Sequence, residues 1–94
     1  MNNLPKLYDR LTWQERRAVR EEYITLQEGK CYYCKSSLDW SAPKHIRDKE
    51  IDWTLFPENF LKYPVHLQHD HDSGLTEGAV HAYCNAVMWY YEAK

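Results

Sequence analysis

The amino-acid sequence predicts a small α+β domain, with an N-terminal helix, a central β-hairpin and a C-terminal helix. Three observations favour this fold class. A helix-capping signal precedes a helical segment that runs to about residue 27, two short extended segments flank a turn sequence at residues 72–74, and an aromatic-rich segment lies near the end of the chain at residues 82–93. With 94 residues, the chain has the size of one domain. We expect this domain to span residues 12–94, after a lead-in segment at residues 1–11.

The predicted N-terminal helix begins after Thr12. The residues from Thr12 to Glu15 match a capping box, in which each side chain accepts a hydrogen bond from the other residue's backbone amide. We expect the helix to continue to about Gln27, and Gly29 suits the position just past its end. A narrow apolar stripe is expected to face the core: Leu11, Trp13, Val19, Tyr23 and Leu26.

The central stretch from Val65 to Asn85 contains four of the five histidines. Because side chains alternate along an extended strand, His69 and His71 are predicted to project from the same face. The sequence at residues 72–74 predicts a short hairpin loop, with Gly74 at positive φ. A second strand is expected at residues 75–80. The segment from Ala82 to Ala93 is predicted to be helical, with Asn85 opening the final helix, and its aromatic residues are expected to pack onto the hairpin and the first helix.

Residues 36–64 carry the weakest signals. Prolines and serines interrupt this segment, and scattered aromatic and aliphatic residues supply apolar anchors. We therefore expect a long loop with one or two short helical turns.

The size and cysteine count together favour a bound metal. A chain of this length buries only about two thirds of its unfolded surface, so its apolar core is marginal and a staple is expected. Three cysteines cannot form a complete disulfide framework, and no secretory signal precedes the domain. A reducing cytoplasm with a metal on the thiolates is the expectation. No apolar run approaches the roughly 18 residues of a membrane span.

Two pairs of residues with the same spacing predict a structural zinc site. Cys31 and Cys34 are separated by two residues, which lets both sulfurs reach one ion, although a redox pair has the same spacing. His81 and Cys84 repeat this gap later in the chain. Together these four side chains complete a tetrahedral site with no position left for water. The alternative is buried free cysteines beside an unrelated histidine, with two matched spacings arising by chance.

The net charge of −2 does not by itself indicate a nucleic-acid-binding protein. Lys and Arg are nevertheless concentrated in residues 1–50, which hold ten of them against eight Asp and Glu, whereas residues 51–94 hold two against six. Arg16, Arg17 and Arg20 lie on neighbouring turns of the predicted helix. This pattern weakly favours a phosphate-contacting surface, and a solvated helix face explains it better.

The central stretch resembles a known family. The run from His69 to Gly74, followed by Gly78 and by His81-x-x-Cys84-Asn85, resembles the recombination endonuclease VII family, a branch of the HNH (ββα-metal) nucleases. That family's usual run is Asp-His-Asp-His, a Thr-Gly turn, Arg-Gly-Leu-Leu and then Cys-x-x-Cys-Asn. The upstream Cys-x-x-Cys also matches, so the resemblance covers residues 31–34 and 66–85. It implies a zinc-stapled ββα-metal fold and a DNA endonuclease. Since the family is common in bacteriophages, it also suggests a phage origin and the host-cell cytoplasm.

The resemblance implies roles for individual residues. His69 falls on the general base that takes a proton from the attacking water. Asn85 falls on a ligand of a catalytic divalent ion such as Mg²⁺ or Mn²⁺, and His71 falls on an active-site histidine that contacts phosphate or the ion. The zinc acts indirectly, by fixing the hairpin against the helix so that His69 and Asn85 face one another.

This sequence departs from the family at three positions. Gln68 stands where the family has a metal-binding Asp, and Glu77 stands where it has an Arg. His81 replaces a zinc cysteine, which an imidazole does without loss. With a neutral Gln68 beside the ion, Asp70 is the candidate replacement anion if the strand twists locally.

Three classes of function follow. The first is a metal-dependent endonuclease acting on DNA, which would need a homodimer to cut both strands together. The second is a catalytically weak or inactive nuclease-derived module that binds nucleic acid or a protein partner. The third is a redox or purely structural zinc protein.

Overall fold

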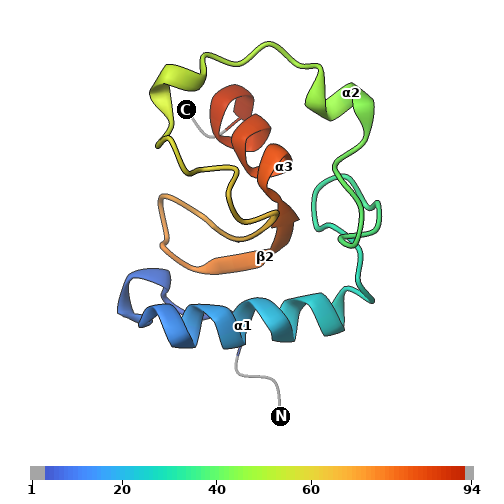
Figure 1. Ribbon diagram of the computed structural model, residues 1–94. Helices are drawn as coiled ribbons and strands as arrows, with labels where there is room; N and C mark the ends of the chain where they lie inside the picture. Colours follow the sequence, from blue (N-terminus) through green and yellow to red (C-terminus); the bar gives the residue numbers. More distant parts are fainter. Residues whose placement is uncertain (1–3, 93–94) are drawn as a thin grey trace.

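A computed structural model of the chain describes residues 4–92. Helix α1 (Trp13–Leu26) lies along one side of a two-stranded antiparallel sheet, formed by β1 (Val65–His69) and β2 (Thr76–His81) (Figure 1). Helix α3 (Ala82–Val87) follows β2 directly and rises away from α1. The predicted α+β arrangement of helix, hairpin and C-terminal helix is therefore confirmed.

The predicted capping box forms at the start of α1. The Thr12 hydroxyl accepts a hydrogen bond from the Glu15 amide at 3.2 Å, and the Glu15 carboxylate accepts one from the Thr12 amide at 2.8 Å. The hydrogen bond from the Thr12 amide stabilises the charged carboxylate, so it lowers the pKa of the Glu15 carboxyl below its ordinary value. The two bonds of the capping box satisfy backbone amides that have no partner within the helix, so they fix where α1 begins.

The end of α1 differs in detail from the prediction. The Gly29 amide donates to the Ile24 carbonyl and the Glu28 amide to the Thr25 carbonyl, which is a Schellman motif. Glu28, with φ of 57°, holds the first left-handed position after the cap, and Gly29 follows it with φ of 75°. Gly29 was expected to be the first residue past the helix end. It is the second, because Glu28 takes the first position.

The apolar stripe of α1 is narrower than predicted. Val19 and Tyr23 are buried, whereas Trp13 is 69 % exposed and Leu26 is 56 % exposed. The Tyr23 hydroxyl is also hydrogen-bonded to Thr76 of β2. Helix α1 therefore rests on the hairpin through its middle, and its first turn projects beyond the core.

The hairpin pairs Val65 with His81 and Gln68 with Gly78, and the register shifts between Gln68 and His69. Gly74 has φ of 76° in the connecting turn, as predicted. The prediction of one extended strand through His69 and His71 is wrong, because β1 ends at His69 and His71 lies in the turn. The two rings nevertheless lie side by side, with 5.0 Å between their centroids.

The second strand also starts and ends one residue later than expected. Leu75 is outside β2 and forms a bridge with Leu7, so the lead-in segment pairs with the hairpin.

Helix α3 begins at Ala82, where the predicted helical segment at residues 82–93 begins, so Asn85 lies inside the helix and does not open it. The helix continues as a π-helical turn, η3 (Met88–Glu92), and the predicted end at Ala93 falls outside the described residues. Val87 is buried, but Trp89 and Tyr91 are exposed, which corrects the expectation that all of these aromatics are core residues.

The segment between α1 and β1 is the predicted loop with short helical turns. It contains α2 (Lys44–Arg47) and a 3₁₀ turn, η2 (Trp53–Leu55), and another 3₁₀ turn, η1 (Tyr8–Arg10), precedes α1. Ring contacts anchor the segment: Phe56 lies 4.8 Å from Phe60 and 5.1 Å from Trp89 between ring centroids.

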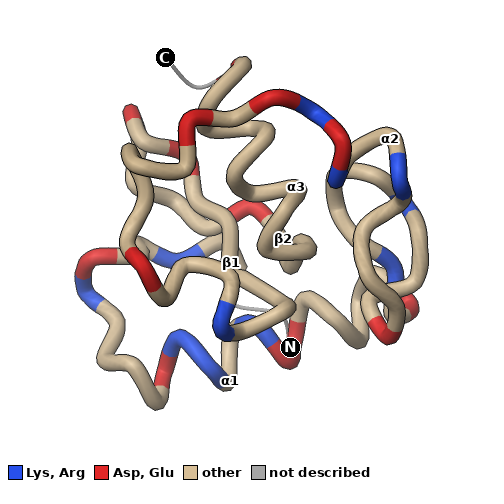
Figure 2. The backbone as a smooth tube through the Cα atoms, turned by 45° about the horizontal axis from the view of Figure 1, so that its top comes forward, with Lys and Arg blue, Asp and Glu red and all other residues tan. Residues whose placement is uncertain are grey.

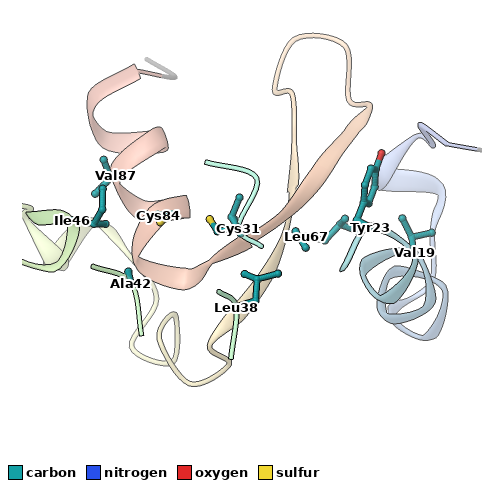
Figure 3. Packing of buried hydrophobic residues seen from close by; sticks show 11 residues of the cluster. Val19, Tyr23, Cys31, Leu38, Ala42, Ile46, Leu67, Cys84 and Val87 are labelled. Atoms are coloured by element: carbon teal, nitrogen blue, oxygen red, sulfur yellow. The ribbon is translucent and has the colours of Figure 1, made fainter. Parts of the chain in front are cut away.

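The buried residues form one core cluster that extends from α1 to α3 (Figure 3). At one end Val19, Tyr23 and Leu67 lie between α1 and the hairpin, and at the other end Ile46 and Val87 lie between α2 and α3. Cys31 and Cys84 lie in the middle of the cluster with their sulfurs facing each other. None of the helices in residues 4–92 is both long and apolar enough to cross a lipid bilayer.

Candidate metal centre and adjoining cleft

The four predicted zinc ligands come together from two distant parts of the chain. Cys31 and Cys34 lie in a tight turn closed by a bridge between Lys30 and Ser37, and His81 and Cys84 lie where β2 passes into α3. One ligand atom from each side chain can be chosen so that all lie within 4.8 Å of one another. The four side chains are therefore close enough to hold one metal ion.

Backbone amides prepare the cysteines for metal binding. The Cys31 sulfur accepts hydrogen bonds from the amides of Tyr33 at 3.4 Å and Cys34 at 3.5 Å. A hydrogen bond from Cys84 and these amides outweigh burial and lower the pKa of the Cys31 thiol to about 4. The same contact and burial raise the pKa of the Cys84 thiol. One thiolate is therefore stabilised even before an ion supplies its charge.

His81 has the orientation of a zinc-bound imidazole. Its Nδ1 lies 3.4 Å from the Cys34 sulfur and 3.6 Å from the Cys84 sulfur, while its Nε2 lies 2.9 Å from the Ser37 carbonyl oxygen. An Nε2–H that donates to this carbonyl leaves the Nδ1 lone pair directed at the sulfurs, and such a second contact usually fixes the tautomer of a metal ligand. The residues fit a structural zinc ion.

The cysteine turn is docked on β2. The Tyr32 amide donates to the Ala79 carbonyl, and the Gln27 side chain both donates to that carbonyl and accepts from the Ala79 amide. A β-carbon on Gly78 would lie 2.7 Å from the Gln27 side-chain oxygen and 2.8 Å from the Tyr32 ring. The close approach of turn and strand therefore requires glycine at residue 78.

A cleft of about 1130 Å³ opens beside the hairpin. It is lined by Gln68, His69, His71 and Asn85, which the sequence singled out, together with His66. Arg16, Arg17 and Arg20 of α1 line the same cleft. Three histidines, an asparagine and three guanidinium groups thus share one open space.

The ring of His69 is held between two other rings. Tyr8 stacks on it with 4.0 Å between ring centroids and an interplanar angle of 12°, and His71 lies 5.0 Å away. The Arg16 guanidinium covers the Tyr8 ring at 3.9 Å and donates to the Tyr8 carbonyl. Burial, followed by the positive charge of His71, lowers the pKa of His69 below its ordinary value. The His69 ring is therefore held in one orientation, and its neutral form is favoured.

Asn85 faces His66 rather than His69. The Asn85 amide nitrogen lies 3.0 Å from His66 Nδ1, and the His66 ring packs edge-on against Phe60. Burial lowers the pKa of His66, so its neutral ring accepts this hydrogen bond. Within residues 4–92, no group is hydrogen-bonded to the side-chain oxygen of Asn85, so this oxygen is free to bind another partner.

Gln68 and Asp70 make contacts within the hairpin. The buried Gln68 donates its amide hydrogens to the His69 carbonyl and, at 3.3 Å, to a Glu77 carboxylate oxygen. Asp70 accepts hydrogen bonds from the amides of Asp72 and Ser73, so it stabilises the turn. The carboxylate beside Gln68 is therefore Glu77.

In the described part of the chain, the Cys₃His group is the single set of three or more His, Cys, Asp or Glu side chains close enough to hold one ion.

The sequence did not predict that Tyr8 and His66 belong to this site, or that Arg16 covers the Tyr8 ring. The single available signal for the arginines was their spacing on one helix face, which solvation explains better. Comparison of the chain with protein-family models, curated proteins and solved structures found no match.

Proposed function

We propose that this protein is a metal-dependent endonuclease of the HNH type that hydrolyses phosphodiester bonds in DNA. One observation carries the proposal: a single cleft is lined by His69, Asn85 and three arginines. A neutral imidazole suits a base that accepts a proton from water at physiological pH. Guanidinium groups are well matched to phosphate oxygens.

In this proposal, each residue has a defined task. His69 accepts a proton from the water that attacks phosphorus, the phosphorus–oxygen bond to the leaving sugar breaks, and its electron pair departs with that oxygen. The arginines hold the phosphate, and His71 contacts it from the turn. Tyr8 and Arg16 keep the His69 ring oriented.

Asn85 and Gln68 are the residues that would hold the catalytic divalent ion, through their side-chain oxygens, with Glu77 as the neighbouring anion. When bound, the ion supplies stabilisation of the negative charge that develops on phosphate and leaving oxygen. Two neutral amides suit Mn²⁺ or a similar transition ion better than Mg²⁺, because Mg²⁺ favours charged oxygen ligands.

A second candidate function is a nuclease-derived module that binds nucleic acid without cutting it. It is favoured by the lack, within residues 4–92, of a second cluster of acidic and histidine side chains close enough to hold an ion. Both candidates use the same cleft, so a cleavage assay separates them.

The test is cleavage of supercoiled plasmid with added Mn²⁺ or Mg²⁺. We expect nicked product, and we expect His69→Ala to lower the rate by about 10²- to 10⁴-fold, the usual loss for a positioned base. The matched control is His45→Ala, since His45 is exposed on α2 and does not line the cleft. Each variant must retain its zinc, because loss of the zinc would also abolish activity. No cleavage with any divalent ion, or equal cleavage by a zinc-replete His69→Ala variant, would contradict the proposal.

A further inference from the structure

Aromatic side chains form much of the cleft lining that the proposed chemistry does not use. The rings come from η1, from α1, from the segment that precedes β1 and from η3: Tyr8, Trp13, Phe56, Phe60, Tyr63 and Trp89. Tyr8 covers His69, and Phe56 and Phe60 pack against each other. Within residues 4–92, Trp13 contacts no other ring, and the Tyr63 ring meets only the Lys62 ammonium, which lies 5.6 Å from its centroid.

Trp13 and Tyr63 are strongly exposed. Trp13 is 69 % exposed and Tyr63 is 61 % exposed, although both border the cleft. Burying such rings in the core would stabilise the fold, since aromatic side chains contribute much of the apolar area that a small domain buries. Their position at the cleft therefore offers flat apolar surfaces to a ligand.

The charge of the cleft differs from that of the whole chain. Arg16, Arg17 and Arg20 line it against a single carboxylate, Glu21, although the net charge of the protein is −2. Figure 2 shows these basic stretches on α1, interspersed with acidic ones. Within residues 4–92 the only close ion pair joins Lys44 and Asp48 on α2, so no carboxylate contact neutralises the arginines. The cleft thus combines cationic groups with exposed aromatic faces.

We propose that the cleft binds unpaired nucleotides of single-stranded DNA, with Trp13 and Tyr63 stacked on bases and the arginines on phosphates. Stacking platforms of this kind bind unpaired bases without sequence preference, because every base has a π-face. In a duplex these faces are covered by neighbouring base pairs, and binding then depends on phosphates and groove edges. Exposed rings beside arginines therefore favour a single strand over a duplex.

This inference rests on the proposed function only where it concerns DNA cleavage, because binding of DNA to the cleft can be measured separately. The probe is a fluorescein-labelled 12-nucleotide single strand, compared with the same strand annealed to its complement, by fluorescence anisotropy. The buffer contains no added divalent ion, so nothing is cut, and no chelator, so the zinc stays bound. We expect the single strand to bind at least about tenfold more tightly than the duplex.

Variants assign the binding to the cleft. Trp13→Ala is expected to weaken single-strand binding roughly tenfold, the usual effect of removing one stacking ring, and to leave duplex binding nearly unchanged. Trp40→Ala is the matched control, because Trp40 is 75 % exposed but does not line the cleft. Tyr63→Ala provides a second test that does not touch α1. Arg17→Gln is expected to weaken binding of both probes and to reduce the salt dependence.

The outcomes distinguish this inference from the nuclease proposal. A protein that binds the single strand through Trp13 but cuts nothing supports the inference and contradicts the nuclease proposal. A protein that cuts plasmid but binds duplex as tightly as the single strand contradicts the inference alone. Equal effects of Trp13→Ala and Trp40→Ala would also overturn it.

Discussion

Tyr8 has an importance that its place before the first helix conceals. Its backbone amide donates to the Gly74 carbonyl, and its ring lies between the His69 ring and the Arg16 guanidinium. A ring stacked at 4.0 Å restricts rotation of His69 about its side-chain bonds. The lead-in segment thus supplies part of the wall behind the proposed base.

We predict that Tyr8→Ala lowers kcat by roughly 10- to 100-fold, because a slightly misplaced catalytic group costs this much. Tyr8→Phe preserves the stacked ring and should retain nearly full kcat. Steady-state kinetics on plasmid, with zinc content measured for each variant, check this. Equal kcat values for the Ala and Phe variants would show that the stack does not position His69.

Gln68 provides a second prediction at this scale. Gln68→Asp adds an anion at the site that we propose for the ion, so the Mg²⁺ concentration for half-maximal cleavage should fall. Electron paramagnetic resonance of bound Mn²⁺ gives a readout that is independent of turnover. An unchanged requirement for Mg²⁺ and unchanged Mn²⁺ binding would show that residue 68 is not a ligand of the ion.

At the scale of elements, the contact between the cysteine turn and β2 depends on one missing side chain. The Tyr32 ring and the Gln27 amide occupy the space in which a β-carbon of residue 78 would lie. Two of the four zinc ligands lie on the turn and one on β2, so this contact also sets the geometry of the metal site.

We predict that Gly78→Ala lowers the free energy of unfolding by about 1–3 kcal/mol, the usual cost of forcing extra volume into a packed site. Urea-induced unfolding followed by circular dichroism measures this change. Gly29→Ala is a useful comparison, because no atom lies within 4 Å of a β-carbon there and only the left-handed φ is strained. A Gly78→Ala protein as stable as the wild type would mean that the turn shifts freely.

For the whole molecule, two of the zinc ligands, Cys31 and Cys84, lie in the middle of the core cluster. The free energy of unfolding of a domain of this size is at most about 15 kcal/mol. Cys31 and Cys84 lie between the α1 side and the α3 side of the core, so an ion bound to them connects the two sides. Binding of a structural zinc is commonly coupled to folding.

We therefore predict one tightly held zinc per chain, and unfolded or insoluble protein after Cys31→Ser or Cys84→Ser. Elemental analysis and circular dichroism check this prediction. A folded preparation with far less than one zinc per chain would contradict it.

Local signals in the sequence predicted the capping box, the turn at Gly74 and the cysteine turn, because each depends on a few neighbouring residues. The metal site was predictable because its two halves share a spacing. The contacts of Tyr8 with His69 and of His66 with Asn85 join distant segments, and no spacing encodes them. Exposure of Trp13 was also hidden, since helical period alone does not reveal how far the core extends.

The outer edge of β2 has a consequence for the protein in concentrated solution. An uncovered strand edge recruits strands from other molecules and is a common origin of aggregation. Here the Thr76 amide donates to the Lys6 carbonyl, while Gln27 and Tyr32 engage both backbone groups of Ala79. The Gln27 side chain substitutes for a peptide group of a neighbouring strand, and it leaves no room for one. Addition of a strand from another molecule at these positions of β2 is thereby blocked.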